Sequence, residues 1–409
     1  MNTTFLKYKR ITTLLAGISM ASIPAVGQAG WSIVDLSNNV GGRYGKVIDL
    51  NDSGQVIGVF EDSDRDAHPF ITGSDGFGMT GLDTLGRDNF TPMGINNSGQ
   101  VVSMMYNADY GSPHTVITGS NGVGATDLGS LGGHFYAWTR GGINDSGQLA
   151  GQFGSGGEEH AFITGPNGVG FTDLGALPGG YISIVNAVNN SGQVVGSSYT
   201  TNGWNGWALT THAFITGPNG VGMTDPGTLG TAYRSDAADL NDSGQVVGQF
   251  GSSTGFGAFI TGTNGVGMTD LGTLGGLHSN ATGINDSGEV VGRGQAADGD
   301  FHAFLFSHGG MTDLNLLDVM VATGWMDIEV LDINNNGQIL GNAYDANTST
   351  DHGFLLSYTP DTIFDPQPYV PSSPIVPISP IPEPQTYAML LAGLGLIGFM
   401  ARRRKETAA

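Results

Sequence analysis

Short apolar runs recur along this chain between turns rich in Asn and Gly, and the same order of runs returns at a nearly fixed spacing. Each return is marked by a turn of the type Asn-x-Ser-Gly-Gln with apolar residues on both sides. The turns start at Asn51, Asn96, Asn144, Asn189, Asn241, Asn285 and Asn334. The intervals are 45, 48, 45, 52, 44 and 49 residues, a period of about 47. The body of the chain is therefore built from seven copies of one unit.

Each unit contains four predicted strands, A to D. Strand A ends just before the Asn turn, as in Gly283-Ile284-Asn285, and strand B follows it, as in Val246-Val247-Gly248. Strand C contains a His-Ala-Phe triplet, and strand D a Met-Thr-Asp-Leu run. The A–B and C–D connections are rich in Asn and Gly because tight hairpins need residues that tolerate positive φ. Four antiparallel strands in a unit of this length are typical of β-propeller blades.

The two ends of the repeated region complement each other. Residues 31–36 match strand D, whereas the last unit stops after its strand C at residues 352–355. We expect the N-terminal strand to close the last blade, because closure removes an exposed sheet edge. The prediction is an all-β, seven-bladed propeller of four-stranded antiparallel blades. An open β-solenoid is the alternative, but it does not require complementary half-units at its ends.

The strand C triplets, plainest at residues 160–162, 212–214 and 302–304, resemble the HAF repeat of bacterial extracellular proteins. The resemblance covers approximately residues 31–358. Some copies depart from the pattern, such as Gly257-Ala258-Phe259, which lacks the histidine. The resemblance implies an extracellular protein and brings no reaction or substrate with it.

Residues 1–29 are predicted to be a secretory signal peptide. Lys7, Lys9 and Arg10 precede an apolar stretch over residues 11–23, and Gly27-Gln28-Ala29 offers the small residues of a cleavage site. A retained membrane anchor is the alternative, although the apolar stretch is too short to span a bilayer. The signal predicts export, and residues 30–360 are expected to form the propeller.

A proline-rich linker over residues 361–381 precedes a C-terminal segment, residues 382–409, with three parts in order. They are a Pro-Glu-Pro triplet, an apolar run over residues 387–401 and an arginine cluster, with the motif residues Pro382, Glu383, Pro384, Arg402, Arg403 and Arg404. This order resembles the PEP-CTERM sorting signal of Gram-negative bacteria. The resemblance implies a short hydrophobic helix, a transient membrane anchor and an exosortase-type processing enzyme as partner. An ordinary single-span anchor is the alternative, but fifteen helical residues cover only about 22 Å of a core of roughly 30 Å.

Charge narrows the range of partners. The chain has 36 acidic and 14 basic residues. Without the signal and the tail, 7 bases stand against 35 acids, a net charge of about −28, which argues against nucleic acid or an anionic membrane as a partner. The chain has no cysteine, so burial alone must stabilise the exported protein.

Histidine occupies the same strand C position in six units, at His68, His114, His160, His212, His302 and His352. We expect these residues to bond within their own blade, in particular to the strand D aspartate, because equivalent positions around a ring are too far apart to share a metal. The turns that start at Asp49, Asp239 and Asp332 resemble the front of a calcium loop but lack its Glu at position 12. No cofactor or metal is expected, with calcium as the alternative.

The B–C connections differ between copies. They contain acids and aromatic residues, among them Glu158, Glu159, Asp298, Asp300, Tyr199, Trp204 and Trp207. B–C and D–A connections lie on the same face of a propeller, and variable loops of this kind carry recognition. Tyr199, Trp204 and Trp207 are the candidate ligand-binding residues, through stacking on sugar rings; plain loop packing is the alternative.

No set of catalytic residues emerges: the chain has no Gly-x-Ser-x-Gly elbow on a strand–helix junction, no His-Glu-x-x-His, no Walker loop and no cysteine nucleophile. The sequence therefore favours a non-enzymatic, cell-surface or matrix-associated protein that binds exopolysaccharide. The alternatives are an enzyme acting on extracellular polysaccharide, through two of the loop acids, and a purely structural display protein.

Overall fold

The computed structural model describes residues 30–358, except residues 38–43, 63, 65, 88–89, 107–112, 132–136, 139–141, 156–157, 201–209 and 254. The predicted signal peptide, the proline-rich linker and the C-terminal segment with its predicted helix lie outside the described residues. Within the described part the protein is all-β, with one short α-helix, α1 (Asp318–Val321). None of the helices in this part is long and apolar enough to cross a bilayer.

Five sheets of the described part have four antiparallel strands each. The first contains β2 (Tyr44–Leu50), β3 (Val56–Glu61), β4 (Ala67–Thr72) and β5 (Met79–Gly81). The second contains β6 (Phe90–Ile95), β7 (Val101–Met105), β8 (His114–Ile117) and β9 (Thr126–Gly129). Two more contain β18 (Arg234–Leu240), β19 (Val246–Ser252), β20 (Gly255–Thr261) and β21 (Met268–Gly272), then β22 (Gly275–Ile284), β23 (Val290–Ala296), β24 (Phe301–Ser307) and β25 (Gly310–Asp313). The fifth contains β26 (Met326–Ile333), β27 (Ile339–Asp345), β28 (Thr350–Tyr358) and β1 (Trp31–Asp35).

The remaining strands form one eight-stranded sheet. Its first group is β10 (Ala137–Trp138), β11 (Ala150–Ser155), β12 (Glu158–Ile163) and β13 (Thr172–Gly175). Its second group is β14 (Gly180–Val188), β15 (Val194–Thr200), β16 (Thr210–Thr216) and β17 (Met223–Thr224). A single parallel pair, Glu159 with Ile182, joins the two groups through β12 and β14. Each group repeats the strand order of the four-stranded sheets.

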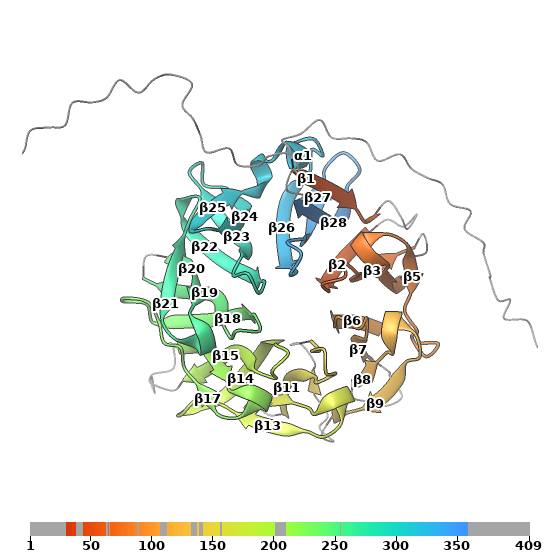
Figure 1. Cartoon of the computed structure of the whole chain (residues 1–409), viewed down its shortest axis with the longest axis vertical. Coiled ribbons are helices and arrows are strands. Elements are labelled where there is room, and N and C mark those ends of the chain that lie inside the picture. Colours follow the sequence, from red (N-terminus) through yellow and green to blue (C-terminus); the bar gives the residue numbers. More distant parts are fainter. Residues whose placement is uncertain are drawn as a thin grey trace, which may run out of the picture. The chain divides into compact units, whose positions relative to one another are not determined.

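The sheets follow one another around a central axis in chain order (Figure 1). Strand A of each unit, such as β2, β18 and β26, lies nearest the axis, and strand D, such as β5 and β21, lies on the outside (Figure 1). This is the arrangement of a β-propeller, and the prediction of an all-β protein made of four-stranded antiparallel units is confirmed.

The two ends of the described chain share one sheet. β1 pairs antiparallel with β28, from Trp31 opposite Tyr358 to Asp35 opposite Phe354. Figure 1 shows β1, in red, beside β27 and β28, in blue. The N-terminal strand therefore supplies the outer strand that the C-terminal strands lack.

The hydrophobic core lies between neighbouring sheets. Val195 and Ile215 of one sheet, for example, pack in one cluster with Leu240 and Phe259 of the next. The phenylalanine of strand C packs on the glycine of strand B, because a methyl group on Gly292 would lie 2.9 Å from Cζ of Phe304. The repeated Val-Val-Gly and His-Ala-Phe patterns are thus two halves of one packing unit.

The C–D connections are short 3-10 turns at Ser74–Gly76, Ser120–Gly122, Pro166–Gly168, Pro218–Gly220 and Thr263–Gly265. The middle residue of each has a left-handed backbone, as at Asn167 with φ 54°. Asn and Asp tolerate this conformation better than other side chains. A further 3-10 turn, Leu314–Leu316, precedes α1.

Candidate binding face and central cavity

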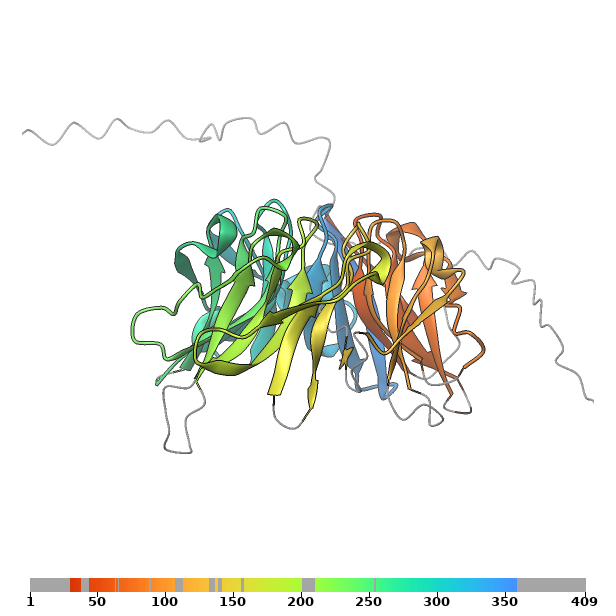
Figure 2. The ribbon, with the colours of Figure 1, turned by 90° about the horizontal axis from the view of Figure 1, so that it is seen from below.

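The strand order gives the ring two different faces. The A–B and C–D turns lie at one end of the strands, which we call the turn face, and they contact each other, as in the bond from Gly76 N–H to the carbonyl of Gly54 at 3.0 Å. The B–C and D–A connections lie at the other end, which we call the variable face. Figure 2 shows the ring from the side, with connections at both ends of the strands.

A belt of asparagines runs around the inside of the turn face. Within each turn the Asn side chain organises the backbone: Oδ1 of Asn51 accepts from the backbone N–H of Ser53 at 3.1 Å and of Gln55 at 3.0 Å. Its Nδ2 donates to the backbone carbonyl of the next Asn turn, Asn96, at 3.0 Å. The same bond links Asn96, Asn144, Asn189, Asn241, Asn285 and Asn334 in order, and Asn334 returns to Asn51. The belt is a closed circle of hydrogen bonds.

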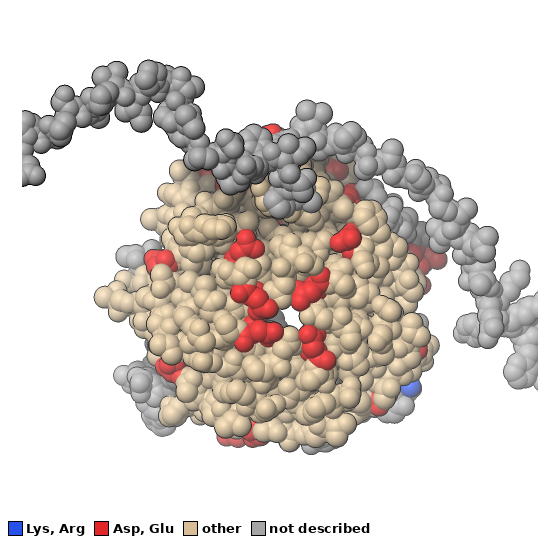
Figure 3. Space-filling view, viewed as in Figure 1, with Lys and Arg blue, Asp and Glu red and all other residues tan. Residues whose placement is uncertain are grey.

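The residue after each Asn forms a second circle closer to the solvent. Each backbone N–H donates to the side-chain Oδ1 of the next unit, through Asp52, Asn97, Asp145, Asn190, Asp242, Asp286 and Asn335. Asp and Asn alternate except where Asp242 meets Asp286, because an odd number of members cannot alternate throughout. The amide of Asn335, for instance, donates to both Asp52 and Asp286 at 3.1 and 2.9 Å. Figure 3 shows acidic side chains gathered around the central opening.

A cavity of about 370 Å³ lies within these circles, lined by the ends of the A strands. Asp49, Asp239 and Asp332 line it at equivalent positions of three units. The carboxylate of Asp49 accepts from Ile95 N–H and that of Asp239 from Ile284 N–H, both at 2.9 Å in the next sheet. Asp49 and Asp239 therefore hold neighbouring sheets together, and the bonds use the oxygens that a calcium loop would direct at an ion.

Burial shifts the titration of these acids. It raises the pKa of Asp49 to about 6, against the opposing effect of hydrogen bonds from Ile95, Leu50 and Asp332. It also raises the pKa of Asp239 to about 7. Burial, together with repulsion from Asp239 and Asp49, raises the pKa of Asp332 well above its ordinary value. The rise in pKa caused by desolvation is larger than the fall caused by the hydrogen bonds, because the charged carboxylate has lost most of its water.

Among the described residues no group of three or more His, Cys, Asp or Glu side chains has the geometry to hold a metal ion. The strand C histidines bond instead to single aspartates. His114, His160, His212 and His302 contact the strand D residues Asp127, Asp173, Asp225 and Asp313 at 2.6–3.1 Å. His352 reaches Asp35 at 3.0 Å, across the junction of the chain ends. The predicted pairing of histidine with the strand D aspartate is confirmed in these units.

The first unit differs. Gly81 occupies the place of the strand D aspartate, and His68 pairs with Asp62 of the B–C connection at 2.8 Å. The bond from His68 lowers the pKa of Asp62. In this unit the histidine therefore pairs with a loop aspartate in place of the missing strand D aspartate.

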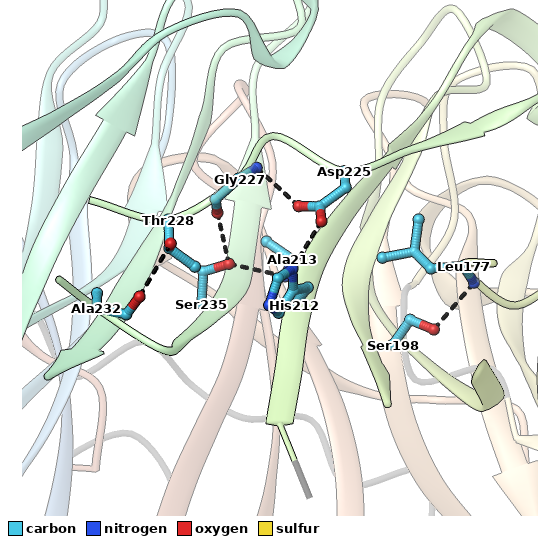
Figure 4. A network of polar contacts seen from close by, with 9 residues as sticks. All are labelled: Leu177, Ser198, His212, Ala213, Asp225, Gly227, Thr228, Ala232 and Ser235. Atoms are coloured by element: carbon cyan, nitrogen blue, oxygen red, sulfur yellow. Dashed lines mark hydrogen bonds and ion pairs between the residues drawn. The ribbon is translucent and has the colours of Figure 1, made fainter. Parts of the chain in front are cut away.

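A serine that the sequence pattern did not single out extends the pairing to the next sheet (Figure 4). Asp225 accepts from His212 at 2.6 Å and from Gly227 N–H at 2.7 Å. Ser235, at the start of the next strand A, donates to the Gly227 carbonyl at 2.8 Å and accepts from Ala213 N–H at 3.0 Å. The His–Asp pairs are therefore part of the connection between sheets.

The structure places one of the three candidate ligand-binding residues. Tyr199 is half-buried at the end of β15 on the variable face. Two residues before it, the hydroxyl of Ser197 donates to Asp236 of β18 at 3.0 Å, and Tyr233, which is 53% exposed, directly precedes β18. Asp236 holds the Arg234 guanidinium at 2.6 Å and raises its pKa. Trp204 and Trp207 lie outside the described residues.

The variable face also carries a group of rings that the sequence did not predict. Phe256, His278 and Phe301 come from β20, β22 and β24 and lie with their planes within 18° of one another. Phe256 and Phe301 hold the same place in strand C, three residues before Phe259 and Phe304, whereas His278 belongs to a strand A. No other unit has an aromatic residue at the place of Phe256, so the repeat pattern did not single it out.

Comparison with known proteins bears on both the tail and the fold. Residues 380–405 match the model of the PEP-CTERM protein-sorting motif, so the predicted sorting signal is confirmed. This motif is a bacterial sorting signal for export with a transient C-terminal membrane anchor, and exosortase-type processing enzymes recognise it. The motif residues Pro382, Glu383, Pro384, Arg402, Arg403 and Arg404 lie outside the described residues.

The β-propeller domain of the trilobed protease from Pyrococcus furiosus is similar, with a TM-score of 0.54 and 10% identity over 79% of this chain and 100% of that domain. An acylaminoacyl peptidase in complex with Z-Gly-Gly-Phe-chloromethyl ketone gives a TM-score of 0.50 and 8% identity, over 76% of this chain and 51% of the peptidase. At such low identity these likenesses show the propeller fold alone. No curated protein matches the chain in sequence.

Proposed function

We propose that this protein is exported to the cell surface or extracellular matrix and binds exopolysaccharide through its variable face without turning it over. Tyr199, at the end of β15, and Tyr233 and Arg234, at the start of the adjoining β18, support this proposal. Tyrosine rings stack on the apolar face of a sugar, and an arginine held by Asp236 offers donors in a fixed orientation to its hydroxyls. Exposed Tyr106 and Tyr181 lie on the same face.

We further infer that the ring has seven blades. The closed belt has seven asparagines, and β1 completes the sheet of β26–β28, as a propeller sealed by its own N-terminus requires. The two groups of the eight-stranded sheet then count as two blades. In an open β-solenoid the last Asn turn, at Asn334, would lie far from the first, at Asn51, and the two would not be hydrogen-bonded.

The repeat unit supports membership of the HAF-repeat proteins, because the residues that define the repeat have a common role. The histidine pairs with an aspartate in each unit that has a histidine, and the phenylalanine is buried in six units. In the same proposal the source is a Gram-negative bacterium, and residues 387–401 form the transient membrane helix that exosortase processing removes.

A binding assay with the full chain tests the proposal. Affinity electrophoresis against a panel of soluble polysaccharides should show that the protein is retarded. Tyr199→Ala and Trp204→Ala should each raise the dissociation constant about tenfold, which is the scale of one lost stacking contact. Phe77→Ala is the matched control, because Phe77 is 61% exposed on the turn face. Its affinity should equal that of the wild type.

Two results would contradict the proposal. Absence of binding across the panel would leave a structural display protein. Release of reducing ends that disappears in Asp298→Asn or Glu158→Gln would show an enzyme instead.

A further inference from the structure

The three rings on the variable face form a stacked aromatic group with nearly parallel planes. The ring centres of Phe256 and His278 lie 4.5 Å apart with their planes 18° from parallel. Phe301 lies 6.4 Å from each of them, at 8° and 10°. We call these three residues the platform. Phe256 comes from the B–C hairpin of one sheet, and His278 and Phe301 come from the next sheet, so the platform bridges the junction between two sheets.

Several contacts hold the platform in place. Phe256 N–H donates to Nδ1 of His278 at 3.4 Å, which fixes the orientation of the imidazole and leaves Nε2 to carry the proton of the neutral ring. His278 packs directly on Gly255, where a methyl group would lie 2.7 Å from its Cε1. Gln295 accepts from Leu277 N–H at 3.0 Å and donates to the Gly299 carbonyl at 2.9 Å, which connects the two loops beside the platform.

The platform does not belong to the hydrophobic core. None of its three rings is a member of the core clusters of the described residues. Phe256 is 36% exposed and the neighbouring Leu277 is 74% exposed. An ordered, preoriented aromatic surface that contributes little to the core is characteristic of a binding site.

The charges around the platform select the ligand. Asp298 and Asp300 are exposed on the hairpin between β23 and β24, which also bears Gly299. Arg293, whose Nε is buried, places its guanidinium carbon 5.5 Å from the centre of the Phe301 ring. In a chain with 36 acids and 14 bases, the exposed carboxylates beside the rings repel an acidic polymer.

We infer that the platform is a subsite for neutral pyranose units of the extracellular polysaccharide; this inference rests on the function proposed above and names the class of its ligand. The apolar C–H face of a pyranose stacks on Phe256 beside Leu277. Nε2–H of His278 donates to a ring hydroxyl, and the carboxylates of Asp298 and Asp300 accept from others. A uronic acid would bring its own carboxylate next to these two acids.

The test uses the full chain in isothermal titration with three probes: cellohexaose and dextran, which are neutral, and polygalacturonate, which is acidic. A neutral probe should bind, with affinity at least tenfold above that for polygalacturonate at matched ionic strength. Phe256→Ala and Leu277→Ala should each weaken binding of that probe about tenfold, while Phe77→Ala changes nothing. Leu277→Ala guards against misfolding because its side chain is 74% exposed.

The outcomes separate this inference from the proposed function. If a neutral probe binds and neither Phe256→Ala nor Leu277→Ala weakens it, the platform is not the subsite, although polysaccharide binding stands. If polygalacturonate binds more tightly than the neutral probes, the ligand class is wrong. If none of the probes binds and the wider panel also fails, the proposed function itself is overturned.

Discussion

The side-chain amide of Asn334 donates a hydrogen bond of 3.0 Å to the backbone carbonyl of Asn51, 283 residues earlier in the chain. Both residues are buried. The bond is the same one that links each Asn turn to the next, so the junction of the chain ends is made in the same way as the junctions within the chain. Leu340 and Leu355 also pack with Val47 and Phe70 across this junction.

Removing this bond should destabilise the ring. Asn334→Ala removes the bond to the Asn51 carbonyl, which keeps the bond from Gly54 N–H, and leaves the backbone N–H groups of Asn336 and Gln338 without the side-chain oxygen that accepts from them. A buried group left unsatisfied costs about 1–3 kcal/mol, so urea denaturation should show a loss of at least that size. Asn347→Ala, at an exposed position, is the control. A loss no larger than that of the control would show that closure does not depend on the belt.

The stability of the ring should depend on pH. The pKa of Asp49 is raised from 3.8 to about 6 and that of Asp239 to about 7, so the folded state holds these protons more tightly than the unfolded chain. Their contribution to stability is full below the unfolded pKa and is lost as pH rises through the folded values. The melting temperature should therefore be higher near pH 5 than near pH 8. In a double variant, Asp49→Asn with Asp239→Asn, this slope should be clearly reduced; an unchanged slope would assign it to other groups.

The His–Asp pairs should differ in strength according to their exposure. In the pair of His302 with Asp313 the side chains are 18% and 15% exposed, whereas in the pair of His68 with Asp62 they are 46% and 36% exposed. Solvent screens the second pair, so His68→Ala should change the free energy of unfolding much less than His302→Ala does. His302→Ala should cost about 1–3 kcal/mol because it leaves a more buried acid without its partner. Equal losses in chemical denaturation would contradict this order.

Strand B should not tolerate a side chain at its glycine. In Gly292→Ala the added methyl group would meet the Asn280 carbonyl oxygen and the Phe304 ring. Overpacking of this kind costs about 1–3 kcal/mol in the free energy of unfolding. Gly81→Ala is a matched control, because no atom lies within 4 Å of a methyl group at that position. The control should unfold at the wild-type denaturant concentration.

Much of this fold is predictable because the same residues make the same contacts in successive units of the repeat. The Asn turn is a local motif, in which one side chain satisfies backbone groups up to four residues away, so its seven copies were visible in the sequence. The partner of each strand C histidine was predictable for the same reason, since both residues recur at fixed places. The exception at His68 follows from the glycine that replaces the aspartate at position 81.

The inner acids and the platform could not be predicted in this way. Asp49 and Asp239 looked like the first residues of calcium loops, because the sequence does not show that the next sheet offers a backbone N–H at 2.9 Å. Phe256 and Phe301 hold equivalent places in two units, but no other unit has an aromatic residue there, and only the packing of the two sheets brings them together with His278. Chemistry that depends on one junction rather than on every junction leaves no periodic signal.

The pairing of β1 with β28 has a mechanical consequence. The sequence that leads to the sorting motif continues directly from the end of β28, so a pull on an anchored tail enters the ring through this strand. β28 is bonded along both sides, to β27 and to β1. A tethered molecule under flow would have to break two hydrogen-bonded ladders at once, whereas an edge strand in the same place would peel away one bond at a time.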